Sequence, residues 1–163
     1  MQAKDVILQT INVGDMIMNK YLEDLEDADF LHRPVEGMNH IAWQMGHLIT
    51  SERNMVEGIK PGSCPPHAEG FYEKHSKKTA GLDGAENFYT KAEYLEAWTA
   101  QRAATKALLE SMTDAELEAP APEQIRSLAP TVGAVFNLTG LHPLMHAGQF
   151  VGVRRARHKP IAF

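Results

Sequence analysis

Residues 141–149 read LHPLMHAGQ, and this stretch places two histidines four residues apart, at His142 and His146. Because about 3.6 residues complete a turn of α-helix, side chains with this spacing lie one above the other on one face. Apolar residues, including Val135 and Leu138, share that face. Polar rings that face a core need a partner, and a divalent metal ion is one that two imidazoles can share. The spacing therefore predicts a helix that presents two ligands of a metal site.

The helix that carries this pair is expected to run from Thr131 to about residue 158. Pro143 removes the amide that would bond to the carbonyl of Thr139, so we expect a kink between the two histidines. Glycines lower the helix propensity further; they stand at Gly140, Gly148 and Gly152. A composition so unfavourable for helix stability indicates a functional role or close helix packing.

Three further segments repeat apolar residues at steps of three and four, which is the period of an amphipathic helix. They cover residues 4–25, 40–58 and 90–112. Asn39 is expected to cap the second segment, and the third opens on a Thr90-x-x-Glu93 capping box. No useful length of sequence alternates as a strand would. These patterns predict an all-α protein, a four-helix bundle in one domain over residues 1–163.

The connection between the second and third helices, residues 61–89, is rich in Gly, Pro, Ser and Lys. A connection of this length is uncommon in a small domain and often forms a lid or a pocket wall. The alternative is a plain crossover that lets two helices run parallel. The composition leaves both interpretations open.

The composition also limits the classes of function. The net charge of −5 argues against a general nucleic-acid binder, which would carry a basic face. The basic residues 154–159 are expected to complement the dipole of a helix C-terminus. Neither a signal peptide nor a membrane span of about 20 apolar residues is recognisable. We expect a cytoplasmic protein that binds no membrane, and the single cysteine, Cys64, suits a reducing compartment.

A third metal ligand could come from the second helix, where His40 and His47 both lie beside the apolar stripe. They are two turns apart, so a rise of about 10 Å separates them and both cannot easily bind one ion. For either residue, a structural hydrogen bond is the alternative to ligation. Periodicity alone does not choose between them.

Residues 40–48, HIAWQMGHL, resemble the second helix of the DinB-like four-helix-bundle metalloproteins. In that family a histidine of helix two joins a His-x-x-x-His-x-Gly-Gln motif of the last helix. Residues 142–149, HPLMHAGQ, are similar to this motif. The chain differs from many members at Pro143 and Ala147, and neither position is a ligand, although pocket shape and substrate do not carry over.

The resemblance implies that His47, His142 and His146 hold a divalent metal ion. It also implies an up-down-down-up bundle with a long crossover between helices two and three, and a homodimer. Three imidazoles leave a coordination position open, which is the pattern of catalytic zinc sites. Zinc and nickel are the expected ions, although imidazole ligands also suit copper and iron.

The activity implied by the resemblance is thiol S-transfer, in which the metal activates a small-molecule thiol against an electrophile, or a related hydrolysis. The alternative is a non-catalytic metal-binding module for stress response or dimerisation, because fold does not determine function. A third interpretation makes the three histidines ordinary core residues. Gln149 lies three residues after His146 and is expected to orient a ligand, to touch the substrate or to make a buried hydrogen bond.

No general base stands out among the acidic and imidazole side chains. The candidates are Glu52, Glu57, Glu36, Asp29, His67 and His75. Pro143 occupies the place that glutamate takes in the His-Glu-x-x-His motif, which excludes a metallopeptidase of that type. The sequence also lacks a Gly-x-Ser-x-Gly elbow, a phosphate-binding loop and a dinucleotide fingerprint.

Overall fold

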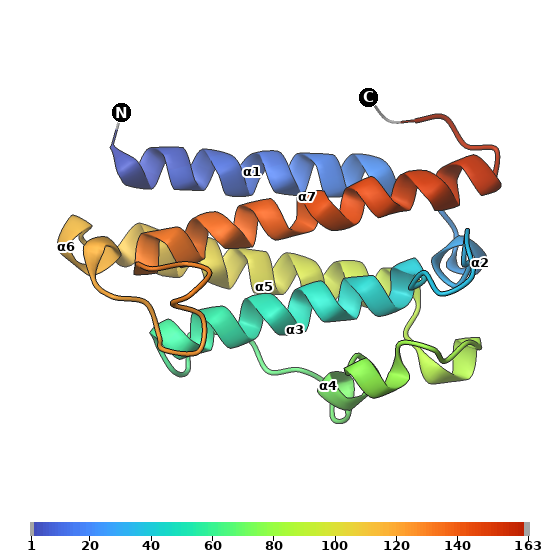
Figure 1. Cartoon of the computed structure of the whole chain (residues 1–163), viewed down its shortest axis with the longest axis horizontal. Coiled ribbons are helices and arrows are strands. Elements are labelled where there is room, and N and C mark those ends of the chain that lie inside the picture. Colours follow the sequence, from blue (N-terminus) through green and yellow to red (C-terminus); the bar gives the residue numbers. More distant parts are fainter. Residues whose placement is uncertain (1, 162–163) are drawn as a thin grey trace.

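The computed structural model describes residues 2–161, and its principal elements are four long helices (Figure 1). They are α1 (Ala3–Leu22), α3 (Ile41–Ile59), α5 (Lys91–Ser111) and α7 (Val132–Ala156). Shorter elements join them: α2 (Asp27–Phe30), α4 (Phe71–Lys74), η1 (Lys77–Thr79), η2 (Ala85–Asn87) and α6 (Asp114–Glu118). The described residues contain no β-strand, only an isolated bridge between Pro120 and Thr131. The prediction of an all-α protein is confirmed.

The four long helices pack side by side around a common core. Helix α1 contacts α7 and α5, and α3 contacts α5 and α7. In Figure 1 the chain runs from left to right along α1 and α7, and from right to left along α3 and α5. The helix bounds lie within three residues of the predicted ones. Within residues 2–161, no helix combines the length and the apolar character needed to cross a membrane.

Helix α7 continues through Pro143 to Ala156, and its glycines have different surroundings. A Cβ atom on Gly140 would lie 2.9 Å from the amide nitrogen of Ile11, and one on Gly14 would lie 2.6 Å from the carbonyl oxygen of Gly140. Helices α1 and α7 therefore touch through their main chains at this level. A Cβ atom on Gly148 would meet nothing within 4 Å, so close packing explains Gly140 but not Gly148.

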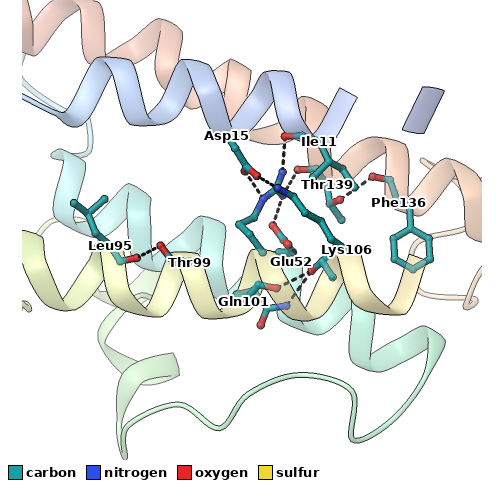
Figure 2. Close-up of polar contacts among 11 residues, drawn as sticks. Ile11, Asp15, Glu52, Leu95, Thr99, Gln101, Lys106, Phe136 and Thr139 are labelled. Carbon is teal, nitrogen blue, oxygen red and sulfur yellow. Dashed lines mark hydrogen bonds and ion pairs between the residues drawn. The ribbon is translucent and has the colours of Figure 1, made fainter. Parts of the chain in front are cut away.

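A buried ion-pair network joins the helices at the centre of the bundle (Figure 2). Arg102 of α5 donates to Asp15 of α1 and to Glu52 of α3, each at 2.6 Å. It also donates to the main-chain carbonyls of Ile11 and Thr139. Arg102 thus contacts all three other long helices, which fixes their relative positions.

The crossover, residues 61–89, packs on the outer side of α3 (Figure 1). Phe71, His75 and Phe88 are buried there, and a Cβ atom on Gly46 would collide with the ring of His75. Arg33 binds the end of the segment by donating to the carbonyls of Ala80 and Leu82. The crossover is therefore anchored against the bundle by buried side chains.

Candidate metal centre

The structure brings His47 of α3 together with His142 and His146 of α7. Each ring offers a nitrogen, and the three nitrogens lie within 4.8 Å of one another. The Nε2 atoms of His142 and His146 are 3.2 Å apart. All three side chains are at least partly buried. The four-residue spacing in α7 thus aligns two rings, as predicted, and the packing of α3 against α7 supplies the third.

Gln44 determines which nitrogen of His146 carries the proton. Its Nε2 donates to the main-chain carbonyl of Asn39 at 2.6 Å, so its Oε1 is the atom that faces His146. An amide oxygen only accepts hydrogen bonds, so Nδ1 of His146 must donate to it over 2.7 Å. The Nε2 atom of His146 then carries a lone pair directed at Nε2 of His142, 3.2 Å away, and is the atom that could bind a metal ion.

The ring of His47 is held by two neighbours on α3. The indole of Trp43 stacks on it with centroids 5.2 Å apart and planes inclined by 4°. The hydroxyl of Ser51 lies 3.5 Å from its Nδ1. Since Trp43 also donates from Nε1 to the carbonyl of Ser76, the crossover helps to hold the stacking partner in place.

The electrostatics of the cluster favour neutral imidazoles. Burial, together with the neighbouring imidazoles, lowers the pKa of His146 to about 3 and that of His142 to about 4. Burial also lowers the pKa of His47. Metal ligation needs an unprotonated ring nitrogen, so all three side chains are in the required form at neutral pH. The donor set therefore fits a divalent transition-metal ion.

His40, the other candidate on this helix, has a structural role. Its Nδ1 accepts the main-chain amide of Trp43 at 3.0 Å, and its Nε2 donates to the carbonyl of Leu82 at 3.2 Å. His40 is therefore the N-cap of α3, and the prediction of Asn39 as the cap is wrong by one residue. Both ring nitrogens are used, so His40 has none left for a metal ion.

The prediction for Gln149 is not supported by its surroundings. Gln149 is exposed on α7, and Gln44 takes the position beside His146 instead. Gln44 and His146 are 102 residues apart in the sequence. A local spacing rule finds Gln149 and misses Gln44 for this reason.

The predicted candidates for a general base are mostly engaged elsewhere. Glu52 pairs with Arg102 in the bundle centre, and burial raises its pKa against the opposing effect of that arginine. Glu57 accepts the amides of Gly62 and Cys64, which lowers its pKa and holds the turn after α3. Asp29 accepts hydrogen bonds from the main-chain amide of Glu26 and from the side chain of Arg157. Burial acts to raise the pKa of Asp29, but these contacts outweigh it and the pKa is lowered.

The two crossover histidines and Glu36 also have other surroundings. His75 is buried, with Nδ1 donating to the carbonyl of Phe71 and Nε2 accepting from the Tyr94 hydroxyl, each at 2.6 Å. His67 stacks on the ring of Phe71. Glu36 is exposed in the loop before α3. None of these side chains belongs to the group of potential metal ligands formed by the triad.

An apolar groove of about 570 Å³ lies beside the triad, with His142 and Ser51 in its wall. Helix α3, helix α7 and the loop of residues 119–131 supply the other lining side chains. No residue of the crossover lines this groove. Residues 65–68 and Phe71 of the crossover do line a second pocket, so the interpretation of the crossover as a pocket wall stays open. Sequence periodicity could not reveal the groove, because three segments distant in sequence form it.

Comparison with known proteins agrees with this architecture. No curated protein matches the chain. The model of the DinB superfamily matches residues 14–150, which is most of the chain and includes all three histidines. The match confirms the resemblance seen in residues 40–48 and 142–149. The chain belongs to the DinB superfamily.

Proposed function

We propose that this protein is an up-down-down-up four-helix bundle that binds one divalent ion, zinc or nickel, through His47, His142 and His146. The contact from Gln44 to Nδ1 of His146 carries the proposal, because it directs a lone pair into the cluster. A purely structural hydrogen bond would not require two further imidazole nitrogens within 4.8 Å.

We further propose that the site is catalytic, in thiol S-transfer to an electrophile or in hydrolysis. Three histidine ligands leave a position for a water molecule or a thiol, and the bound ion lowers the pKa of either group toward neutrality. The groove beside His142 supports this function, because it gives a small molecule access to the cluster. A structural zinc site, by contrast, is closed by a fourth protein ligand.

The second candidate function is a metal-binding module without catalysis, acting in stress response or dimerisation. The observation in its favour is that Glu52, Glu57 and Asp29 all have structural partners. Because these three carboxylates are engaged, a catalytic reaction would need a general base supplied by the substrate or by solvent. Activity measurements on the metal-loaded protein separate the two functions.

The test of metal binding uses protein purified without a histidine tag and stripped with EDTA. Calorimetric titration with zinc and with nickel should give one site per chain. Substitution of any one of the three histidines by Ala should weaken metal binding at least 100-fold; the variants are His47→Ala, His142→Ala and His146→Ala. His158→Asn is the matched control, because His158 is exposed and has a positive φ of 54° that Asn tolerates. Equal affinity in the control and the triad variants would refute the site.

The test of catalysis compares the metal-loaded and stripped proteins. Conjugation of glutathione or cysteine to monochlorobimane, and hydrolysis of 4-nitrophenyl acetate, should be accelerated only by the loaded protein. His146→Ala should abolish the acceleration. A protein that binds one ion per chain and accelerates neither reaction class, across a panel of thiols and esters, would favour the non-catalytic module.

A further inference from the structure

The groove beside the triad is built from three separate segments of the chain. Its floor and walls come from α3, α7 and the loop of residues 119–131. The lining residues are Ser51, Asn54, Met55, Gly58, Pro122, Gln124, Ile125, Leu128, Leu138, His142 and Met145. A volume of about 570 Å³ lies within the usual range of about 300–1,000 Å³ for small-molecule sites.

The lining carries no formal charge, although 23% of the chain is Asp, Glu, Lys or Arg. Aliphatic and thioether side chains form most of it. The polar lining residues are Ser51 and His142 beside the histidine cluster and the exposed amides of Asn54 and Gln124. A charged group would lose its hydration in the groove without gaining a counter-ion. The chemistry of the lining therefore selects an uncharged, largely apolar ligand.

Two residues connect the groove to the metal ligands. His142 is itself a lining residue and lies with its ring centroid 5.2 Å from that of His47. Ser51 also lines the groove, and its hydroxyl lies 3.5 Å from Nδ1 of His47. A ligand in the groove thus has the histidine cluster beside it. The rest of the lining lies on α3, on the loop and, at Leu138 and Met145, on α7.

Two large apolar side chains that line the groove remain exposed, and a ligand could cover them. Leu128 is 68% exposed and Met145 is 60% exposed, which are high fractions for large apolar side chains. Burial of such surface contributes about 25 cal/mol per Å² to binding. The exposed pair therefore supplies a driving force for a ligand that extends beyond the cluster.

We infer that the groove holds the apolar body of the substrate, an uncharged aliphatic or aromatic small molecule whose reactive polar end lies at His142. The inference rests on the proposed metal site and specifies the substrate class of that site. It assigns Leu128, Met145 and Leu138 to substrate selection and the three histidines to the metal. A substrate with a phosphate or a carboxylate in the groove is excluded by this assignment.

The test uses n-alkyl hydroxamates from two to eight carbons, because the hydroxamate binds zinc and the alkyl chain measures the groove. With the zinc-loaded protein, affinity should rise about two- to four-fold per methylene over the first few methylenes. Leu128→Glu should remove this dependence and weaken the eight-carbon compound at least ten-fold. The two-carbon compound should bind the variant within two-fold of the unchanged protein.

Leu141→Glu is the matched control, because Leu141 is a 43% exposed leucine of α7 that does not line the groove. It should keep the dependence on chain length. The inference would be overturned if affinity for the zinc-loaded protein did not depend on chain length, or if both variants lost the same affinity. Neither result would contradict the metal site. The inference would also be overturned if affinity did not depend on chain length and the protein were a dimer that Leu128→Glu dissociates. The groove would then be an interface with a second copy of the chain. Failure to bind zinc would overturn the proposed function itself.

Discussion

The Oε1 atom of Gln44 lies 2.7 Å from Nδ1 of His146 and holds the ring proton on the side away from the triad. The amide itself is oriented by its donation to the carbonyl of Asn39. A main-chain carbonyl just before α3 therefore sets the tautomer of His146 on α7. This chain of contacts gives the first prediction.

Gln44→Leu should weaken zinc binding about 10- to 100-fold, because the ring of His146 loses the acceptor that fixes its tautomer. Competitive titration against a chromophoric chelator measures the change. Gln149→Leu is the control, since Gln149 is an exposed glutamine of α7. If both variants bound zinc as the unchanged protein does, Gln44 would have no role in orienting the ligand.

Gly140→Ala should lower the free energy of unfolding by about 1–3 kcal/mol, because its Cβ would press on the main chain of α1. Gly148→Ala should raise it by about 0.5–1 kcal/mol, because the added methyl has free space and alanine favours the helix. Urea denaturation of the stripped proteins measures both. We expect the two substitutions in α7 to change the free energy of unfolding in opposite directions. Equal changes would contradict the close approach of the main chains at Gly140.

Glu52→Leu should destabilise the fold by about 3 kcal/mol, because Arg102 would lose one of its buried carboxylate partners. The exposed Lys20–Glu23 pair provides the control. Glu23→Gln should change stability by less than about 0.5 kcal/mol. Thermal and urea denaturation measure the difference. If the folded Glu52→Leu protein retained catalysis, a general-base role for this residue would be excluded.

His75 should make the fold sensitive to acid. Burial lowers its pKa to about 4 in the folded protein, below the usual value of about 6.5. The neutral ring is therefore favoured by folding, so its contribution is complete above about pH 6.5 and is lost as the pH falls toward 4. One proton per chain corresponds to a slope of about 1.4 kcal/mol per pH unit within this window.

His75→Gln should remove that part of the pH dependence, although it costs stability at neutral pH. Free energies of unfolding at intervals between pH 7 and pH 4 provide the comparison for metal-free protein. The difference between variant and unchanged protein should shrink as the pH falls. A difference that stays constant over the window would show that folding does not lower the pKa of His75.

The sequence contains enough local information to predict the four long helices and two of the three clustered histidines. Apolar periodicity marks the helices, and the spacing of His142 and His146 places both rings on one face of α7. The resemblance to the family predicts His47 and not His40 as the third histidine, because periodicity gives both similar positions on the helix. The structure explains that choice through the two hydrogen bonds of His40.

Contacts between distant segments account for what the sequence could not predict. Gln44 and His146 meet only because α3 packs against α7, and no spacing rule relates residues 102 positions apart. Glu52 is a buried residue of α3, and its pairing with Arg102 depends on how α5 is placed. The groove likewise depends on where the loop of residues 119–131 returns to the bundle.

The loop that forms one wall of the groove packs on α3 and α7 through Ala121 and Ala129, and it holds none of the three histidines. Its exposed side chains, Gln124 and Leu128, contact neither Gly140 nor the bond between Gln44 and His146. Exchange of these exposed side chains would alter the surface that a ligand meets, while the three histidines and Gln44 keep their positions. For protein engineering, randomising Gln124 and Leu128, which are both exposed, offers a route to altered selectivity at little cost to folding.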